Sequence, residues 1–121
     1  MVQITAIFNE EVFVTGTPQI TLETGLADAV INYAVGSGTN TLVFNYTVAE
    51  SDTATNLDYK STSSLVLNNG SIKDVAGNSA SLTLASPSST NSLGANKSII
   101  IDGNAPSIRL LTSTKSNGYY G

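Results

Sequence analysis

GSGTNTLVFNYTV, residues Gly36 to Val48, is the clearest buried strand in the sequence. Its apolar side chains are Leu42, Phe44, Tyr46 and Val48, and they alternate with Val43 and polar residues. A period of two behind a Gly-rich turn is typical of a half-buried β-strand. An apolar sheet face needs a second layer to cover it, so this stretch predicts a layered β-fold.

The same alternation recurs in short segments along the rest of the chain. The expected strands are Val2–Phe8, Val12–Val14, Gln19–Leu22, Ala29–Val35, Leu65–Leu67, Ser71–Asp74, Leu82–Leu84, Ser98–Asp102 and Ser107–Thr112. No ten-residue segment has the apolar spacing of a helix, and strands every ~8–12 residues are typical of a sandwich. The sequence therefore predicts an all-β fold with almost no helix.

Three connections carry more specific expectations. Glu10-Glu11 is expected to break the chain into two separate strands, Val2–Phe8 and Val12–Val14. Asn68-Asn69-Gly70 predicts a hairpin between residues 65–67 and 71–74, because Asn and Gly tolerate positive φ. Residues 49–64 are polar and are expected to form a crossing loop that only Leu57 and Tyr59 anchor to the core.

Composition bounds the function. The 121 residues suffice for one domain, and only 12% are charged, compared with roughly 25% in an average globular protein. The net charge is −4, and the five basic residues are scattered singly, so no nucleic acid is expected as a partner. No apolar run approaches the ~20 residues of a membrane span, so no membrane insertion is expected, and any export signal is expected outside this sequence.

Catalytic chemistry finds no support in the residues. The chain has no His and no Cys, which excludes Ser-His-Asp, Cys-His and thiolate zinc arrangements. Glu10 and Glu11 are adjacent, so on a strand they point to opposite faces and cannot form a glycosidase pair. No Gly-rich phosphate loop opens a helix. We expect no enzyme and no resident organic cofactor.

Six blocks of the sequence, in this order, carry a family resemblance. They are Phe8–Val12, Gly16–Leu22, Gly36–Val48, Leu57–Tyr59, Ile72–Asn78 and Ile101–Pro106. Together they resemble the bacterial immunoglobulin-like, cadherin-like tandem repeats of very long surface proteins, adhesins and cell-surface motility proteins among them. The resemblance implies an antiparallel Ig-like β-sandwich of about seven to eight strands.

The resemblance also implies a function. It implies a non-catalytic structural or adhesive module of an extracellular bacterial surface protein, with neighbouring repeats of the same protein as its partners. A carbohydrate- or other ligand-binding module that acts through loops at one pole of the sandwich is the alternative. A fold shared by so many functions does not choose between them.

In such arrays a repeat begins after an Asn-Ala-Pro linker, which here is Asn104 to Pro106. Residues 1–103 are therefore expected to form a sandwich that lacks its usual first strand. Residues 104–121 are expected to be the linker and the first strand of the following repeat. The missing strand would leave open edges beside residues 2–8 and 98–102, and Ser107–Thr112 is expected to pair with another copy or to project unpaired.

Calcium is the metal that the residues favour, because Asp, Asn, Glu and carbonyl oxygens suit it. The linker Asp102-Gly-Asn104-Ala-Pro106 resembles the calcium-binding joint of cadherin-like repeats. Three further carboxylates would complete a site if their loops converge at the same pole. The candidate ligands are Asp102, Asn104, Glu10, Glu11 and Asp74. The alternative is a plain turn in which Asp102 and Asn104 bond to their own backbone.

Overall fold

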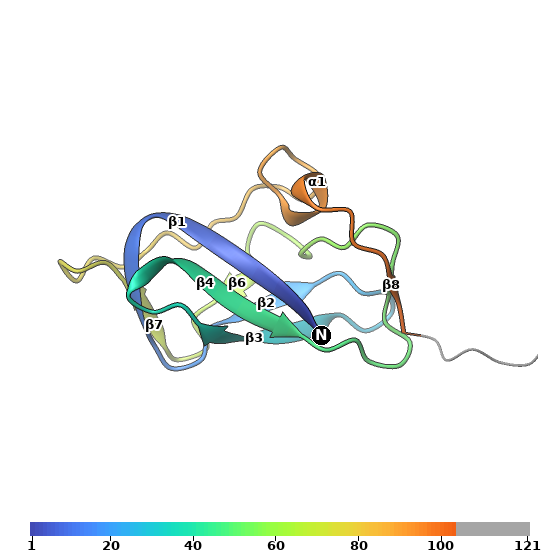
Figure 1. The fold of residues 1–121 in the computed structure, drawn as a ribbon, viewed down its shortest axis with the longest axis horizontal. Coiled ribbons are helices and arrows are strands. Elements are labelled where there is room, and N and C mark those ends of the chain that lie inside the picture. The colour runs from blue at the N-terminus through green and yellow to red at the C-terminus, as the bar shows by residue number, and fades with distance from the viewer. Residues whose placement is uncertain (104–121) are drawn as a thin grey trace, which may run out of the picture.

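The computed structural model describes residues 1–103, which fold into a curled antiparallel sheet of six strands with a small second sheet of two (Figure 1). The elements are β1 (Val2–Thr15), β2 (Gln19–Leu22), β3 (Ala29–Val35), β4 (Thr39–Tyr46), β5 (Thr53–Ala54), β6 (Leu65–Val66), β7 (Ser71–Lys73), α1 (Leu93–Asn96) and β8 (Ile101–Asp102). The strand order is β6-β2-β3-β4-β1-β7 in one sheet and β5-β8 in the other. The predicted all-β sandwich is confirmed.

β4 lies inside the large sheet, between β3 and β1, as expected for the clearest buried strand of the sequence. Leu42, Phe44 and Tyr46 are buried, and the ring of Phe44 meets that of Tyr33 edge-on at 6.2 Å. Val48 is 38% exposed, so its predicted place on the buried face is wrong. The strand ends at Tyr46 because the next residues turn around the buried carboxylate of Asp52, which accepts from the backbone N–H of Ala49.

β1 is one continuous strand, so the expected interruption at Glu10-Glu11 is wrong. Its register with β4 shifts between Ile7 and Val12. Beyond the shift, Phe13–Thr15 pair with β7 instead. The two glutamates lie in this bulged part, where exposed charged side chains are tolerated and the strand changes partner.

The Asn68-Asn69-Gly70 turn forms, but the hairpin expected around it does not. Asn68 and Asn69 have φ of 49° and 65°, and the N–H of Gly70 donates to the Leu67 carbonyl. However, β6 pairs with β2 and β7 pairs with β1, at opposite edges of the large sheet. The turn therefore connects the two edge strands of the curled sheet, β6 and β7, instead of two neighbouring strands.

The C-terminal part has fewer ladders than the sequence predicts. Leu82 and Leu84 pack partly buried against the core without a strand. Of residues 98–102 only Ile101–Asp102 form a strand, which pairs with β5. One turn of helix, α1, was not expected, and the Ser92 hydroxyl caps it by accepting from the Ala95 N–H at 3.2 Å. Residues 107–112 lie outside the described residues.

The crossing loop is anchored as predicted. Leu57 is fully buried and Tyr59 is 8% exposed. The loop also carries two buried acids, Asp52 and Asp58, so the expectation that only Leu57 and Tyr59 reach the interior is wrong.

Candidate functional site

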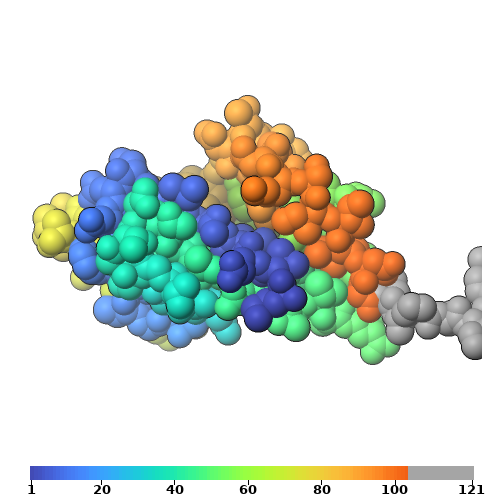
Figure 2. All heavy atoms as spheres, in the orientation of Figure 1, coloured from blue at the N-terminus to red at the C-terminus, as the bar shows by residue number. Residues whose placement is uncertain are grey.

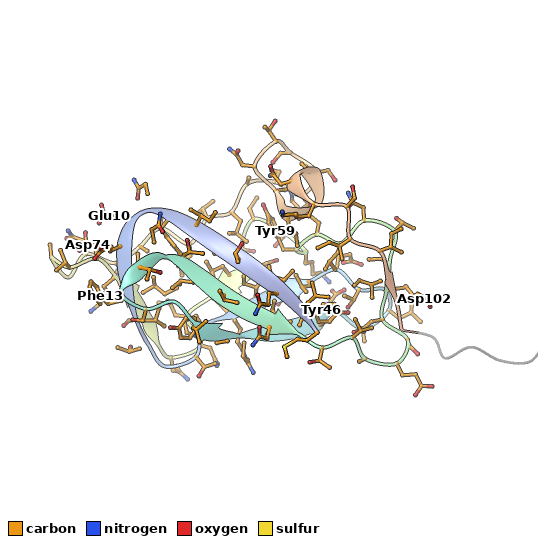
Figure 3. The ribbon with its side chains drawn as sticks, in the orientation of Figure 1. Glu10, Phe13, Tyr46, Tyr59, Asp74 and Asp102 are labelled. Carbon is orange, nitrogen blue, oxygen red and sulfur yellow. The ribbon has the colours of Figure 1, made fainter. Side chains whose placement is uncertain are left out.

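The candidate calcium ligands do not all come together (Figure 3). Asp102 lies at one end of the molecule, and Glu10 and Asp74 lie at the opposite end. Glu11 lines a shallow hollow together with Glu10, and Asn104 lies outside the described residues. Within residues 1–103 no three His, Cys, Asp or Glu side chains are placed to hold a metal. The four candidate ligands within residues 1–103 therefore do not converge on one calcium site.

Glu10 and Asp74 do form a carboxyl pair, beside a hollow of about 250 Å³ that Phe8 and Val12 also line. The backbone N–H of Asn78 donates to Asp74 Oδ1 at 2.8 Å, and its amide donates to Oδ2 at 3.1 Å. These bonds lower the pKa of Asp74. The hydrogen bond with Asp74 and its negative charge raise the pKa of Glu10. As pH falls, the proton that the pair first accepts therefore goes to Glu10.

We expect Glu10→Gln to raise the melting temperature at pH 7. A carboxyl whose pKa is higher in the folded state than its ordinary 4.5 stabilises the fold at low pH, and that stability is lost as pH rises through the folded pKa. Glutamine cannot ionise, so the variant does not lose this stability as pH rises. The difference in melting temperature between the variant and the unmodified chain should therefore shrink as pH falls toward 4.5. Asp74 stays charged over this window because its pKa is lowered.

Thermal melts between pH 4.5 and 8 would measure the effect. Glu50→Gln is the control, because it removes one negative charge without touching Asp74. A gain of the same size and pH dependence in Glu50→Gln would show that net charge, and not the pair, is responsible.

The two buried acids hold loops in place. Asp52 Oδ2 accepts from the Tyr46 hydroxyl at 2.7 Å and from the Ala49 N–H at 2.9 Å. Burial, followed by the bond to Asp52, raises the pKa of Tyr46. Asp58 accepts from the N–H groups of Tyr59 and Ser88, each at 2.9 Å. These contacts use the carboxylates of Asp52 and Asp58 to hold the loops around them.

A row of amide side chains crosses the outer face of the large sheet, and the sequence pattern did not predict it. The register aligns Gln3 with Asn45, Asn45 with Asn32, and Asn32 with Gln19. Gln19 Nε2 donates to Asn32 Oδ1 at 2.9 Å, whereas Asn45 Oδ1 is buried without a partner among the described residues. In the sequence each residue is only a polar position facing solvent, and no signal within one strand could have shown that they align.

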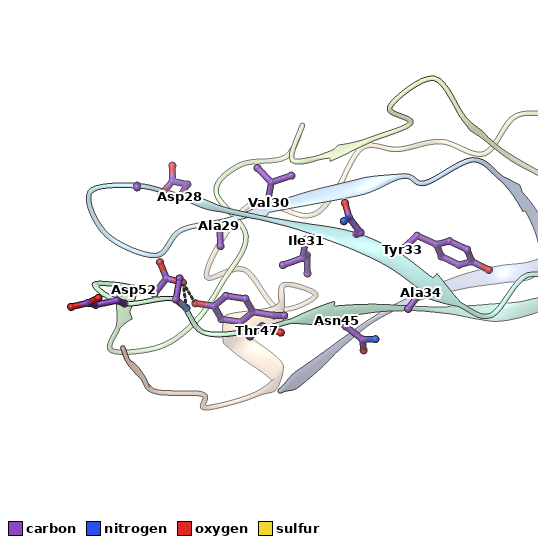
Figure 4. Close-up of a pocket in the computed structure, with 14 residues that line it drawn as sticks. Asp28, Ala29, Val30, Ile31, Tyr33, Ala34, Asn45, Thr47 and Asp52 are labelled. Carbon is purple, nitrogen blue, oxygen red and sulfur yellow. Dashed lines mark hydrogen bonds between the residues drawn. The ribbon is translucent and has the colours of Figure 1, made fainter. Parts of the chain in front are cut away.

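The surroundings of this row are uncharged over four strands. The neighbouring outward positions are Thr5, Ile7, Thr21, Val30, Ala34, Thr41, Val43 and Thr47. A groove of about 640 Å³ opens beside the row between β3 and the end of β4 (Figure 4). Asp28 and Glu50 line its far end, and Asp28 forms an ion pair with Lys60. The face offers neutral donors and acceptors and no reactive group.

Residues 1–103 contain no helix that is long and apolar enough to cross a membrane. A scan against models of protein families, a search of curated proteins and a search of solved structures each found no match to this chain.

Proposed function

We propose that this chain is a non-catalytic structural or adhesive repeat module of a long extracellular bacterial surface protein. The order of the six sequence blocks supports this. The structural observation that carries it is how firmly the chain is held just before the linker. Asp102 pairs with Thr53 in the small sheet, and the N–H of Gly103 donates to the Asp52 carbonyl at 2.7 Å.

The fit at Gly103 is tight. A Cβ there would lie 2.1 Å from the Ala49 carbonyl oxygen, so only glycine can occupy the position without moving the backbone. The Asp52 whose carbonyl accepts from Gly103 also binds Tyr46 at the end of β4. Hydrogen bonds through Asp52 thus connect Gly103, the residue before the linker, to the central strand β4. A spacer needs such a connection, because a linker that is fixed to the core of one module limits how the next module can be oriented.

The sequences that flank this chain in its gene test the proposal. Near-copies of the six blocks on both sides are expected. A single copy beside a catalytic domain would overturn the proposal.

Calcium enters this proposal only at a joint between two modules, with Asp102 as one ligand. We expect calcium to raise the melting temperature of a two-module protein more than that of this chain, because ligands supplied by two docked modules bind only the folded state. The two-module protein joins residues 1–112 directly to a second copy that begins at Val2. Asp102→Asn in its first module is the matched control.

Calorimetry with and without calcium would measure the two shifts. Equal shifts in the single chain and the two-module protein, or a shift that survives Asp102→Asn, would remove the joint site.

The alternative function is binding of an uncharged carbohydrate, and the amide row favours it. Amides can pair with vicinal hydroxyls, and a neutral face suits a neutral ligand. The outer face, not the loops at a pole, is then the binding surface. Titration with neutral polysaccharides, followed by NMR, would separate the two functions. Polysaccharide binding that is abolished by Asn32→Ala would favour the carbohydrate-binding function. If no polysaccharide binds, the structural or adhesive repeat remains the proposed function.

A further inference from the structure

Half of β1 has a neighbour on one edge only. Residues Val2 to Ile7 pair with β4, and β7 reaches the other edge only at Phe13–Thr15. Among the described residues no further backbone hydrogen bond joins residues 2–8 to any second neighbour. In an antiparallel strand alternate residues direct their N–H and C=O groups to each edge. The first half of β1 therefore presents a row of unpaired backbone groups.

The inward-facing side chains along this edge are apolar, and most of them are incompletely covered. Val2, Ala6 and Phe8 are only partly buried against the core, whereas Ile4 between them is 5% exposed. In Figure 2 the first residues of β1 (dark blue) are open on the same face as the last described residues (orange). Among those last residues Ile100 is 77% exposed.

The edge also lacks the devices that normally protect such strands. Proteins block open edges with Lys, Pro, bulges or inward charges. Residues 2–8 read Val-Gln-Ile-Thr-Ala-Ile-Phe, without a charge or a proline, and the bulge comes only after Ile7. An unprotected, apolar, unpaired half-strand is the kind of site that β-strand addition uses.

We propose that the open edge of β1 binds residues Ser107–Thr112 of a second copy of this chain as an added antiparallel strand. The segment, Ser-Ile-Arg-Leu-Leu-Thr, places Ile108 and Leu110 on one side and is the remaining strand-like sequence in the 18 residues beyond Gly103. Antiparallel pairing matches the rest of the sheet. The inference deepens the proposed function, on which it rests for assigning this segment to a following repeat, by naming the partner.

The number of residues between Gly103 and Ser107 determines whether residues 107–112 can pair with β1 of the same chain or only with β1 of a second copy. Gly103 lies at the end of the sheet where β1 begins, because it contacts Asp52, which binds Tyr46, the partner of Val2. An antiparallel strand would have to start beside Phe8, about 20 Å away at ~3.4 Å per residue. The four residues from Gly103 to Ser107 span at most ~14 Å. A chain cannot fill its own edge in this orientation, but a second copy can.

Disulfide trapping tests the proposal directly, because the chain contains no cysteine of its own. Chains carrying Thr5→Cys are mixed with chains carrying Arg109→Cys or Leu111→Cys and are oxidised mildly. These side chains would share the outward face of the paired strands, where Cβ atoms approach to ~4.5–5.5 Å. A mixed disulfide dimer is expected in at least one of the two mixtures.

Leu26→Cys is the matched control, because Leu26 is fully exposed in a loop outside the open edge. The mixed dimer with Thr5→Cys should exceed that with Leu26→Cys by on the order of tenfold. Equal yields would overturn the proposal. A disulfide within one chain, in a diluted Thr5→Cys and Leu111→Cys double variant, would also overturn it, since it would indicate parallel pairing of the chain with its own tail.

Sedimentation of the full chain gives an independent measurement. Self-association is expected, as reciprocal dimers or open chains, and Leu110→Pro should weaken it by on the order of tenfold because proline removes a ladder donor. Leu110 lies outside residues 1–103, so the substitution alters no contact of the described fold. A chain that remains monomeric, or association unchanged by Leu110→Pro, would refute strand addition. Neither result would bear on the proposed repeat function, which the flanking gene sequence tests separately.

Discussion

Replacing Phe44 with alanine is expected to lower the free energy of unfolding by about 3–5 kcal/mol. The side chain is completely buried, and its ring meets Tyr33 edge-on from the neighbouring strand. β4 joins the two halves of the large sheet, so the surrounding backbone cannot collapse easily into the cavity. Domains of this size have total stabilities of about 5–15 kcal/mol, so the change removes a large part of the total.

Urea denaturation of the variant and of two controls would measure this loss. Phe44→Leu retains most of the volume and should lose less. Val30→Ala truncates an apolar residue on β3 that is 54% exposed, and it should change stability by about 0.5 kcal/mol or less. If Phe44→Ala lost no more than Val30→Ala, β4 would not be the centre of the core.

Replacing Gly36 with alanine is expected to lower the free energy of unfolding by about 3 kcal/mol or more. Gly36 has φ of +123° in the connection between β3 and β4, a conformation that side chains with a Cβ rarely adopt. A Cβ would also lie 2.1 Å from the Thr41 carbonyl oxygen and 2.9 Å from the Leu42 Cα. Both obstacles are backbone atoms of β4, so the hairpin itself would have to move.

Gly77→Ala separates the steric clash from the backbone strain. Gly77 also has a positive φ, +88°, but nothing lies within 4 Å of the position that a Cβ would take there. Its replacement should cost only the strain of a left-handed conformation, about 1–2 kcal/mol. Comparing the two variants by urea denaturation isolates the clash. Equal losses at the two glycines would contradict the close approach of Gly36 to β4.

Local pattern was sufficient for the strands that pair with their sequence neighbours. β2, β3 and β4 were expected within a few residues of their observed bounds, because alternation and the Gly36–Gly38 turn are both short-range signals. The partners of β6 and β7 could not be predicted in this way. The Asn68-Asn69-Gly70 signal specifies backbone angles at a turn, and it does not specify which strands lie on either side of the curl.

The same distinction applies to the candidate site. The sequence grouped Glu10, Glu11 and Asp74 with Asp102 in one site. Glu10 and Asp74 do lie together, but the topology places Asp102 at the far end. The amide row depends on the register of four strands, so Asn32 and Asn45 could not be aligned before their pairing was known. The burial of Asp52 could not be predicted either. Its carboxylate is held by the hydroxyl of Tyr46, and the sequence does not show that this hydroxyl reaches residue 52.

The change of partner along β1 has a consequence for how the chain folds during synthesis. Thr15 pairs with Ser71, which is made 56 residues later. At ~5–20 residues per second the ribosome needs about 3–11 s to cover that distance. The β2–β3–β4 meander can form from local contacts in the meantime. β1 is therefore completed only after β2, β3 and β4 have been made, and the apolar residues of its second half remain open to a chaperone or to a neighbouring nascent chain for seconds.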